Sequence, residues 1–164
     1  MATIAFKGQP VKTNGDLPAI GNLSPGFTLV NADLTEVGLD DFGGKKKILN
    51  IFASLDTGVC ANSVRKFYQL CKERDDVVVL NISMDLPFAS GRFCSTENLE
   101  GCETLSAFRS SFADDYGIKM IEGPLSGLCS RAVVVLGEDN KVIYTEQVPE
   151  FTQEPSYEKA IEAL

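Results

Sequence analysis

The sequence predicts an α/β protein with a mixed central β-sheet flanked by helices. Two short apolar runs, at 47–52 and 77–82, are typical of strands buried on both faces. The segment between them, 59–74, has apolar residues at helical spacing. Because a strand–helix–strand crossover is right-handed, these two strands are expected to run parallel. Two further runs, 132–136 and 141–145, are joined by four residues with hairpin-loop chemistry and add antiparallel strands.

Shorter elements complete the prediction. Residues 3–13 alternate weakly around a glycine and a proline, which favours an N-terminal β-hairpin, and 27–30 is typical of a short strand. Helical stretches are expected at 39–42, 87–93, 104–115 and 155–164. Since no repeat, low-complexity stretch or linker interrupts the chain, residues 1–164 are expected to form one domain.

The composition excludes several classes of function. The chain has no histidine, which excludes Ser-His-Asp and Cys-His mechanisms and His-ligated metal sites. Its formal net charge of −8 repels phosphate backbones and anionic lipid, so neither nucleic acid nor a membrane is expected as a partner. No apolar run is long enough to span a bilayer.

The N-terminal sequence and the cysteine count bear on the compartment. The start, MATIAFKGQPVK, lacks the charged, apolar and small-residue regions of a secretion signal, which predicts a cytoplasmic protein. Five cysteines are an odd number, so they cannot all pair within the chain. In a reducing compartment these thiols are expected to be free unless redox chemistry is their purpose.

Cys60 is the strongest candidate for a reactive thiol. It ends the segment ASLDTGVC, which leads from a buried strand into a helix, and such loops carry sites in α/β sheets. Thr57 is a good helix-entry residue, which places Cys60 in the first turn, where free N–H groups and the macrodipole favour a thiolate. The alternative is a small buried hydrophobe on the apolar face of the helix. The residues alone weigh the two interpretations about equally.

The other cysteines carry weaker signals. Cys94 ends a short helical stretch, where local opening can expose it to a partner thiol, but spacing alone does not select that partner, and an incidental cysteine is the alternative. Cys71 lies about 16 Å along the helix from Cys60, too far for a disulfide, and is expected to fill the core. Cys102 and Cys129 are expected to be incidental. Neither a C-x-x-C motif nor a zinc-type cysteine pair occurs, so no metal is expected.

Arg131 stands immediately before the apolar run 132–136. The common role of an arginine at a strand start is a solvated charge. The functional interpretation is a fixed guanidinium that pairs with a thiolate or a developing oxyanion. The run Lys45-Lys46-Lys47 is interpreted as a solvated turn, because the acidic net charge argues against an anion site.

Three segments carry a resemblance to a known family: SLDTGVC with the following SVRKF, SMDLPFASGRFC at 83–94, and GLCSRAVVVL at 127–136. Together they resemble the thiol peroxidases, bacterial peroxiredoxins of the atypical two-cysteine kind. The resemblance covers essentially the whole chain, and the pattern at 83–94 is long and specific. It implies a thioredoxin-like fold and the reduction of hydrogen peroxide and organic hydroperoxides.

The resemblance also implies roles for four residues. Cys60 matches the peroxidatic cysteine, which becomes a sulfenic acid, and Cys94 matches the resolving cysteine, which converts it to an intramolecular disulfide. Thr57 matches the threonine whose hydroxyl hydrogen-bonds the thiolate and orients the peroxide, and Arg131 matches the arginine that polarises both. A homodimer and reduction by thioredoxin are implied as well, and no cofactor is expected. Because a first-turn and a helix-end cysteine are not expected to be adjacent, disulfide formation is expected to need local unfolding.

One position departs from the family's pattern. The peroxiredoxin motif reads P-x-x-x-T-x-x-C, and Ala53 stands where the proline belongs. The proline fixes the loop backbone and shields the sulfur, so the alanine is expected to affect pocket rigidity, rate and resistance to over-oxidation. Two other functions stay open. One is a thiol–disulfide oxidoreductase, against which the missing C-x-x-C counts, and the other is a redox-responsive binding protein with weak peroxidase activity.

Overall fold

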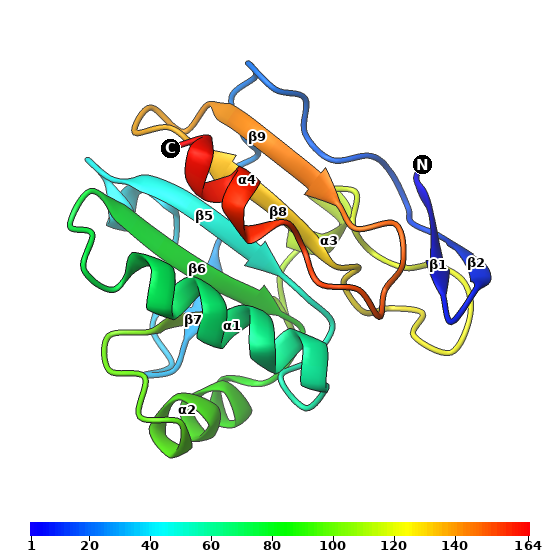
Figure 1. Cartoon of the computed structure of the whole chain (residues 1–164), viewed down its shortest axis with the longest axis horizontal. Helices are drawn as coiled ribbons and strands as arrows, with labels where there is room; N and C mark the ends of the chain where they lie inside the picture. Colours follow the sequence, from blue (N-terminus) through cyan, green and yellow to red (C-terminus); the bar gives the residue numbers. More distant parts are fainter.

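The computed structural model describes residues 1–164 and contains one large sheet and one small one (Figure 1). The large sheet has seven strands, in the order β4 (Glu36–Val37), β3 (Leu29–Asn31), β7 (Glu103–Ser106), β6 (Val77–Ser83), β5 (Lys46–Ile51), β8 (Ala132–Leu136) and β9 (Val142–Gln147). The helices are η1 (Leu39–Phe42, a 3-10 helix), α1 (Gly58–Cys71), α2 (Pro87–Thr96), α3 (Phe112–Asp115) and α4 (Tyr157–Glu162).

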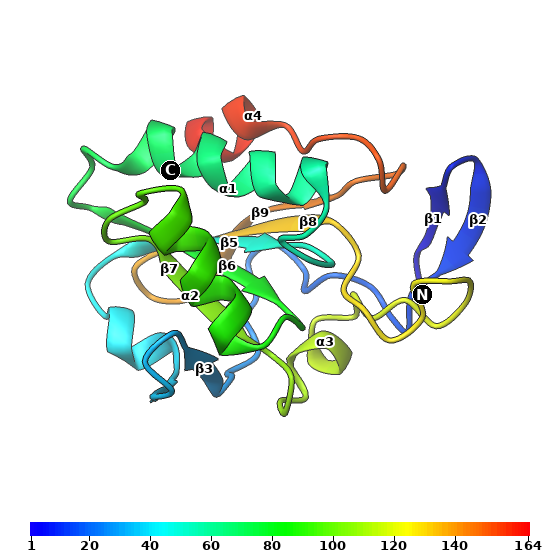
Figure 2. The ribbon, with the colours of Figure 1, turned by 90° about the horizontal axis from the view of Figure 1, so that it is seen from below.

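The pairing confirms the predicted mixed sheet. Strand β5 runs parallel to β6 and antiparallel to β8, and β8 and β9 form the expected antiparallel pair. Helices α1 and α4 cover one face of the sheet, and α3 and the η1 segment lie on the other (Figure 2). The central strands read as apolar runs because both faces are covered, and every residue of β8 is buried. No helix of the chain is both long and apolar enough to cross a membrane.

The register between β5 and β8 decides what lies beside the first turn of α1. Ile51, the last residue of β5, pairs with Ala132, the first residue of β8. The two strands are antiparallel, so the end of β5 and the start of β8 meet at one edge of the sheet. Residue 131 is thereby placed next to the loop that enters α1. This pairing joins two segments that are far apart in the sequence.

Residues 1–13 form the predicted hairpin, with β1 (Thr3–Phe6) antiparallel to β2 (Gln9–Lys12). Its two-residue turn places Lys7 and Gly8 at φ values of 50° and 80°, as a type I′ turn requires. The backbone N–H groups of both residues donate to the Glu150 carboxylate, at 3.0 and 3.1 Å. The hairpin lies apart from the large sheet (Figure 1) and is anchored to the segment after β9.

Two local predictions are wrong. The stretch 104–115, expected to be helical, begins with strand β7, and only Phe112–Asp115 is helical. Strand β7 is parallel to β6 and antiparallel to β3, so its backbone is paired on both sides. Lys47 is not in a solvated turn. It lies in β5, fully buried, and its Nζ donates to Asn140 Oδ1 at 2.7 Å, which satisfies the buried ammonium.

Candidate active site

Cys60 lies in the first turn of α1, as the sequence predicts. Thr57 is the N-cap, with extended backbone, and the Ala61 N–H donates to its carbonyl at 3.0 Å to begin the helix. The Cys60 side chain is fully buried in an apolar cluster with Phe52 and Leu55 from the entry loop, and with Val64 and Leu99. Such a site is dry, so charges and hydrogen bonds directed at the sulfur act strongly on it.

Arg131 reaches the sulfur of Cys60 from the start of β8. Its Nη2 donates to Cys60 Sγ at 3.3 Å, and its Nε donates to the carbonyl of Phe151 at 3.1 Å. The guanidinium carbon lies 5.1 Å from the centre of the Phe151 ring, within range of a cation–π contact. Only 1% of Arg131 is exposed, so this arginine is not the solvated charge that is common at a strand start.

The Arg131 guanidinium still has a free donor group. Its Nη1 is buried and has no hydrogen-bond partner within the protein. Buried donors are nearly always paired, and an unpaired one is costly. Beside a buried thiol, a free N–H of a permanent cation suits an acceptor oxygen that carries or develops negative charge.

Thr57 is close to Cys60 in the chain, but it does not make the hydrogen bond that the resemblance implies. Its Oγ1 donates to the carbonyl of Ser54 at 3.0 Å, and no hydrogen bond joins it to Cys60 Sγ. A hydroxyl has one proton, and Ser54 uses it here. The side-chain hydrogen bond of Thr57 therefore joins two residues of the same entry loop.

Asp85, which follows β6, holds this entry loop, and sequence reasoning missed it. Its carboxylate accepts hydrogen bonds from Ser54 Oγ at 2.8 Å and from the Leu55 N–H at 2.7 Å. It also accepts from Ser83 Oγ at 3.1 Å, and Ser106 donates to its backbone carbonyl. The loop is thus tied to the ends of β6 and β7. The sequence feature that could have indicated Asp85 is its place in the specific pattern at 83–94. Its hydrogen-bond partners follow only from the fold.

Ala53, at the motif's proline position, is buried in the entry loop. It packs with Ile4 and Val11 of the hairpin and with Met120 and Phe151. Its backbone N–H donates no hydrogen bond. The hairpin and the Asp85 carboxylate therefore hold the loop in place without the proline.

Cys94 lies in α2, half-buried, and is not part of the apolar cluster around Cys60. All five cysteines are free in this structure, so Cys60 and Cys94 are not joined. The neighbour of the Cys94 thiol is Cys102, which precedes β7. A hydrogen bond from Cys102 lowers the pKa of Cys94, and one from Thr104 adds to this.

The remaining two cysteines fill the core. Cys71 packs on the inner face of α1 with Phe67 and Val77, and burial raises its pKa. Cys129 is fully buried in the largest apolar cluster, and burial raises its pKa as well. Neither thiol is hydrogen-bonded to Arg131, so neither has the environment that Cys60 has.

A family model described as Redoxin matches residues 19–161. The chain belongs to the redoxin family. This redoxin is 49% identical over 164 residues to the thiol peroxidase of Mycobacterium bovis (strain ATCC BAA-935 / AF2122/97), a match covering 100% of this chain and 99% of that protein. The thiol peroxidase of Corynebacterium glutamicum (strain ATCC 13032) is also 49% identical, with the same coverage.

Solved structures of this redoxin's relatives agree in fold. A peroxiredoxin-like protein from Aquifex aeolicus superposes with a TM-score of 0.92 at 34% identity, covering 100% of this chain and 98% of that one. A thiol peroxidase from Chromobacterium violaceum has a TM-score of 0.90 at 22% identity, covering 98% and 93%, and supports the fold alone. The thioredoxin-like fold is confirmed, and so is the prediction that the protein is a peroxiredoxin-type thiol peroxidase.

Proposed function

We propose that this thiol peroxidase reduces hydrogen peroxide and organic hydroperoxides through a sulfenic acid on Cys60. The observation that carries the proposal is the 3.3 Å hydrogen bond from Arg131 Nη2 to Cys60 Sγ inside a dry cluster. A buried cation beside a first-turn cysteine stabilises the thiolate, which is the reactive form. No imidazole is needed for this activation.

The first step is attack of the Cys60 thiolate on one oxygen of the peroxide. A sulfur–oxygen bond forms, the O–O bond breaks, and the departing oxygen takes a proton to leave as water or an alcohol. Negative charge develops on that oxygen, and the free Nη1 of Arg131 is the donor suited to it. We assign Thr57 the orientation of the peroxide through its hydroxyl oxygen, whose proton is used by the Ser54 carbonyl.

The second step is resolution by Cys94. Its thiolate attacks the sulfenic sulfur, the hydroxyl leaves as water, and a Cys60–Cys94 disulfide forms. Cys60 is fully buried and Cys94 lies outside its cluster, so the step requires opening of α2 or of the first turn of α1. An external dithiol then reduces the disulfide, and we propose thioredoxin in this role. The homodimer implied by the resemblance stays a prediction, which sedimentation velocity tests.

Two variants test the proposal in a coupled assay with thioredoxin, its reductase and NADPH. Cys60→Ser is expected to abolish peroxide reduction, and full activity in that variant would overturn the assignment. Cys94→Ser is expected to consume one equivalent of peroxide and then stop, because its sulfenic acid has no resolving thiol. Cys129→Ser is the control. It removes a core thiol that makes no hydrogen bond to Arg131 and is expected to keep cycling.

A further inference from the structure

Cys94 and Cys102 form a pair of neighbouring thiols. After α2 the chain folds back in two tight steps: the Leu99 N–H donates to the carbonyl of Cys94 at 3.0 Å, and the Cys102 N–H donates to the carbonyl of Leu99 at 3.2 Å. These turns bring Cys102 back to the end of α2, and the interaction between the two thiols lowers the pKa of Cys94 and raises that of Cys102. A disulfide between them requires the two sulfurs to approach to about 2.05 Å.

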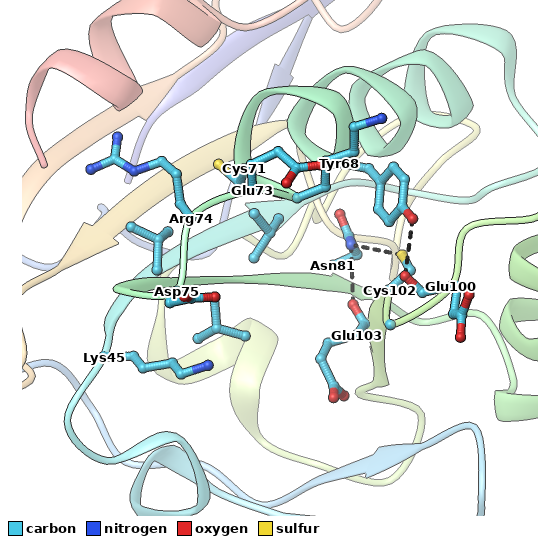
Figure 3. Close-up of a pocket in the computed structure, with 15 residues that line it drawn as sticks. Lys45, Tyr68, Cys71, Glu73, Arg74, Asp75, Asn81, Glu100, Cys102 and Glu103 are labelled. Carbon is cyan, nitrogen blue, oxygen red and sulfur yellow. Dashed lines mark hydrogen bonds between the residues drawn. The ribbon is translucent and has the colours of Figure 1, made fainter.

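A buried polar chain connects Cys102 to the helix of Cys60. Ser63 Oγ donates to the carbonyl of Cys60 at 2.7 Å, and Asn50 Nδ2 donates to Ser63 Oγ at 3.1 Å and to Asn81 Oδ1 at 2.9 Å. Asn81 Nδ2 in turn donates to Cys102 Sγ at 3.5 Å (Figure 3). Cys102 also packs against the apolar cluster that holds Cys60, which Cys94 does not. Its sulfur is therefore held in a defined place at the edge of the apolar cluster that contains Cys60.

The pair lies between two hollows of the surface. Cys102 lines a cavity of about 480 Å³ with Tyr68 and Asn81 (Figure 3). Cys94 lines a neighbouring hollow of about 370 Å³, and Glu100 lines both. A disulfide between the two sulfurs would thus be open to solvent, whereas Cys60 is fully buried.

We propose that Cys102 is an exchange cysteine, which moves the disulfide from Cys60–Cys94 to Cys94–Cys102. The proposal rests on the proposed function, because it begins from the Cys60–Cys94 disulfide. It adds a step between resolution and reduction, and it changes which disulfide the external dithiol reduces.

The step is a thiol–disulfide exchange within one chain. The Cys102 thiolate attacks the sulfur of Cys94, a Cys94–Cys102 bond forms, and the Cys60–Cys94 bond breaks with its electron pair on Cys60. The proton of Cys102 goes to water. The oxidation state of the protein is unchanged, because one disulfide replaces another. The leaving thiolate of Cys60 returns to Arg131, and a stabilised thiolate is the better leaving group.

The interaction between the two thiols sets the order of events. While Cys94 is free, Cys102 keeps its proton as the donor, and the pKa of Cys102 is raised by this interaction and by burial. Cys94 is therefore the first nucleophile. Once Cys94 is in a disulfide, Cys102 loses that acceptor, and the Asn81 amide remains as a donor that favours its thiolate. Burial still opposes ionisation, so the exchange is expected to accelerate with rising pH.

The test maps disulfides after one equivalent of hydrogen peroxide, without reductant, by alkylation and peptide mass spectrometry. Wild type is expected to accumulate Cys94–Cys102 with Cys60 alkylated, and Cys102→Ser is expected to stop at Cys60–Cys94. Serine keeps a donor for Cys94, so this variant removes the exchange and leaves the first resolution in place. Cys71→Ser, which removes the other thiol of the same cavity, is expected to match wild type.

Peroxide stoichiometry gives an independent measurement. Exchange frees Cys60 to react again, so with dimedone present to trap sulfenic acid, wild type is expected to consume about two equivalents per chain. The second appears as a Cys60–dimedone adduct on molecules that hold the Cys94–Cys102 disulfide. Cys102→Ser is expected to consume about one equivalent, because Cys60 stays in its disulfide.

The outcomes separate this inference from the proposed function. A wild-type protein that holds only Cys60–Cys94 and consumes one equivalent overturns the exchange while leaving peroxide reduction intact. A Cys60–Cys102 disulfide overturns it too, since Cys102 then attacks Cys60 directly. Failure of the proposed function looks different, because Cys60 would stay reduced in wild type and in every variant.

Discussion

Arg131 and Cys60 are 71 residues apart in the chain, and their side chains meet through a 3.3 Å hydrogen bond from Nη2 to Sγ. The contact exists because Ile51 pairs with Ala132, which brings the end of β5 and the start of β8 together. Both partners are buried, so the cation acts on the sulfur with little screening by water. This pairing places a permanent cation against the sulfur of a first-turn cysteine in a protein without histidine.

Replacement of Arg131 tests that contact. Arg131→Met fills a similar volume and removes every donor, and the rate constant of Cys60 with peroxide is expected to fall by about 10²–10³. Stopped-flow kinetics measures it, with circular dichroism to show that the variant folds. Arg109→Met is the matched control, because Arg109 is an exposed arginine that pairs with Glu36 at 2.9 Å. An equal loss in both variants would contradict a specific role for Arg131.

Asp85 is expected to position the entry loop. Asp85→Ala removes the acceptor of Ser54 Oγ and of the Leu55 N–H, so the loop that carries Cys60 loses its anchor. Small misplacements at a reacting centre are costly, and the rate constant with peroxide is expected to fall by roughly 10–100-fold. Asp56→Ala alters an exposed carboxylate of the same loop and is expected to stay near wild type. A wild-type rate in Asp85→Ala refutes the positioning role.

The motif's proline is expected to be accepted at position 53. Ala53→Pro sacrifices no hydrogen bond, because the Ala53 N–H donates none, and it restricts the unfolded chain. The free energy of unfolding is expected to rise by about 0.4–1 kcal/mol. Differential scanning calorimetry is expected to show Tm higher by about 1–4 °C. A lower Tm means that the backbone at this position is unsuited to proline.

The pH dependence of resolution tests the hydrogen bond between Cys94 and Cys102. This bond lowers the pKa of Cys94, so its thiolate is present at lower pH than that of a free cysteine. Cys102→Val removes the donor and raises that pKa. Resolution near pH 7 is therefore expected to slow and to recover as the pH rises, whereas Cys102→Ser keeps the donor and the wild-type profile. Pulsed trapping of the Cys60 sulfenic acid follows the reaction, and identical profiles in all three proteins contradict the account.

Strong periodicity explains which parts of the fold the sequence predicts. Strands β5, β6 and β8 are apolar because they are covered on both faces, and the face of α1 follows from its spacing. Strand β7 was not predicted because its sequence, ETLS, is short and polar. Its stability comes from pairing with two neighbouring strands. Tertiary contacts determine the secondary structure of such a segment, and the apolar spacing around it wrongly predicted a helix.

The residues of the site also divide into those that local sequence rules predict and those that depend on tertiary contacts. The place of Cys60 follows from a local rule, since a helix begins after a strand and a loop. The place of Arg131 depends on strand register, and the roles of Asp85 and Cys102 depend on contacts between α2, β6 and β7. Cys102 is eight positions after Cys94 in the sequence, but only the fold shows that two tight turns bring it back to the end of α2.

The identity of the oxidised sulfur tests the account most directly. In Cys94→Ser/Cys102→Ser, the proposed resolving thiol and the proposed exchange thiol are both absent, so the sulfenic acid formed by peroxide cannot be converted to a disulfide with either. Treated with one equivalent of hydrogen peroxide and dimedone, this variant is expected to carry a single adduct on Cys60 by peptide mass spectrometry. An adduct on Cys71 or Cys129, with Cys60 left as a thiol, would contradict the central claim.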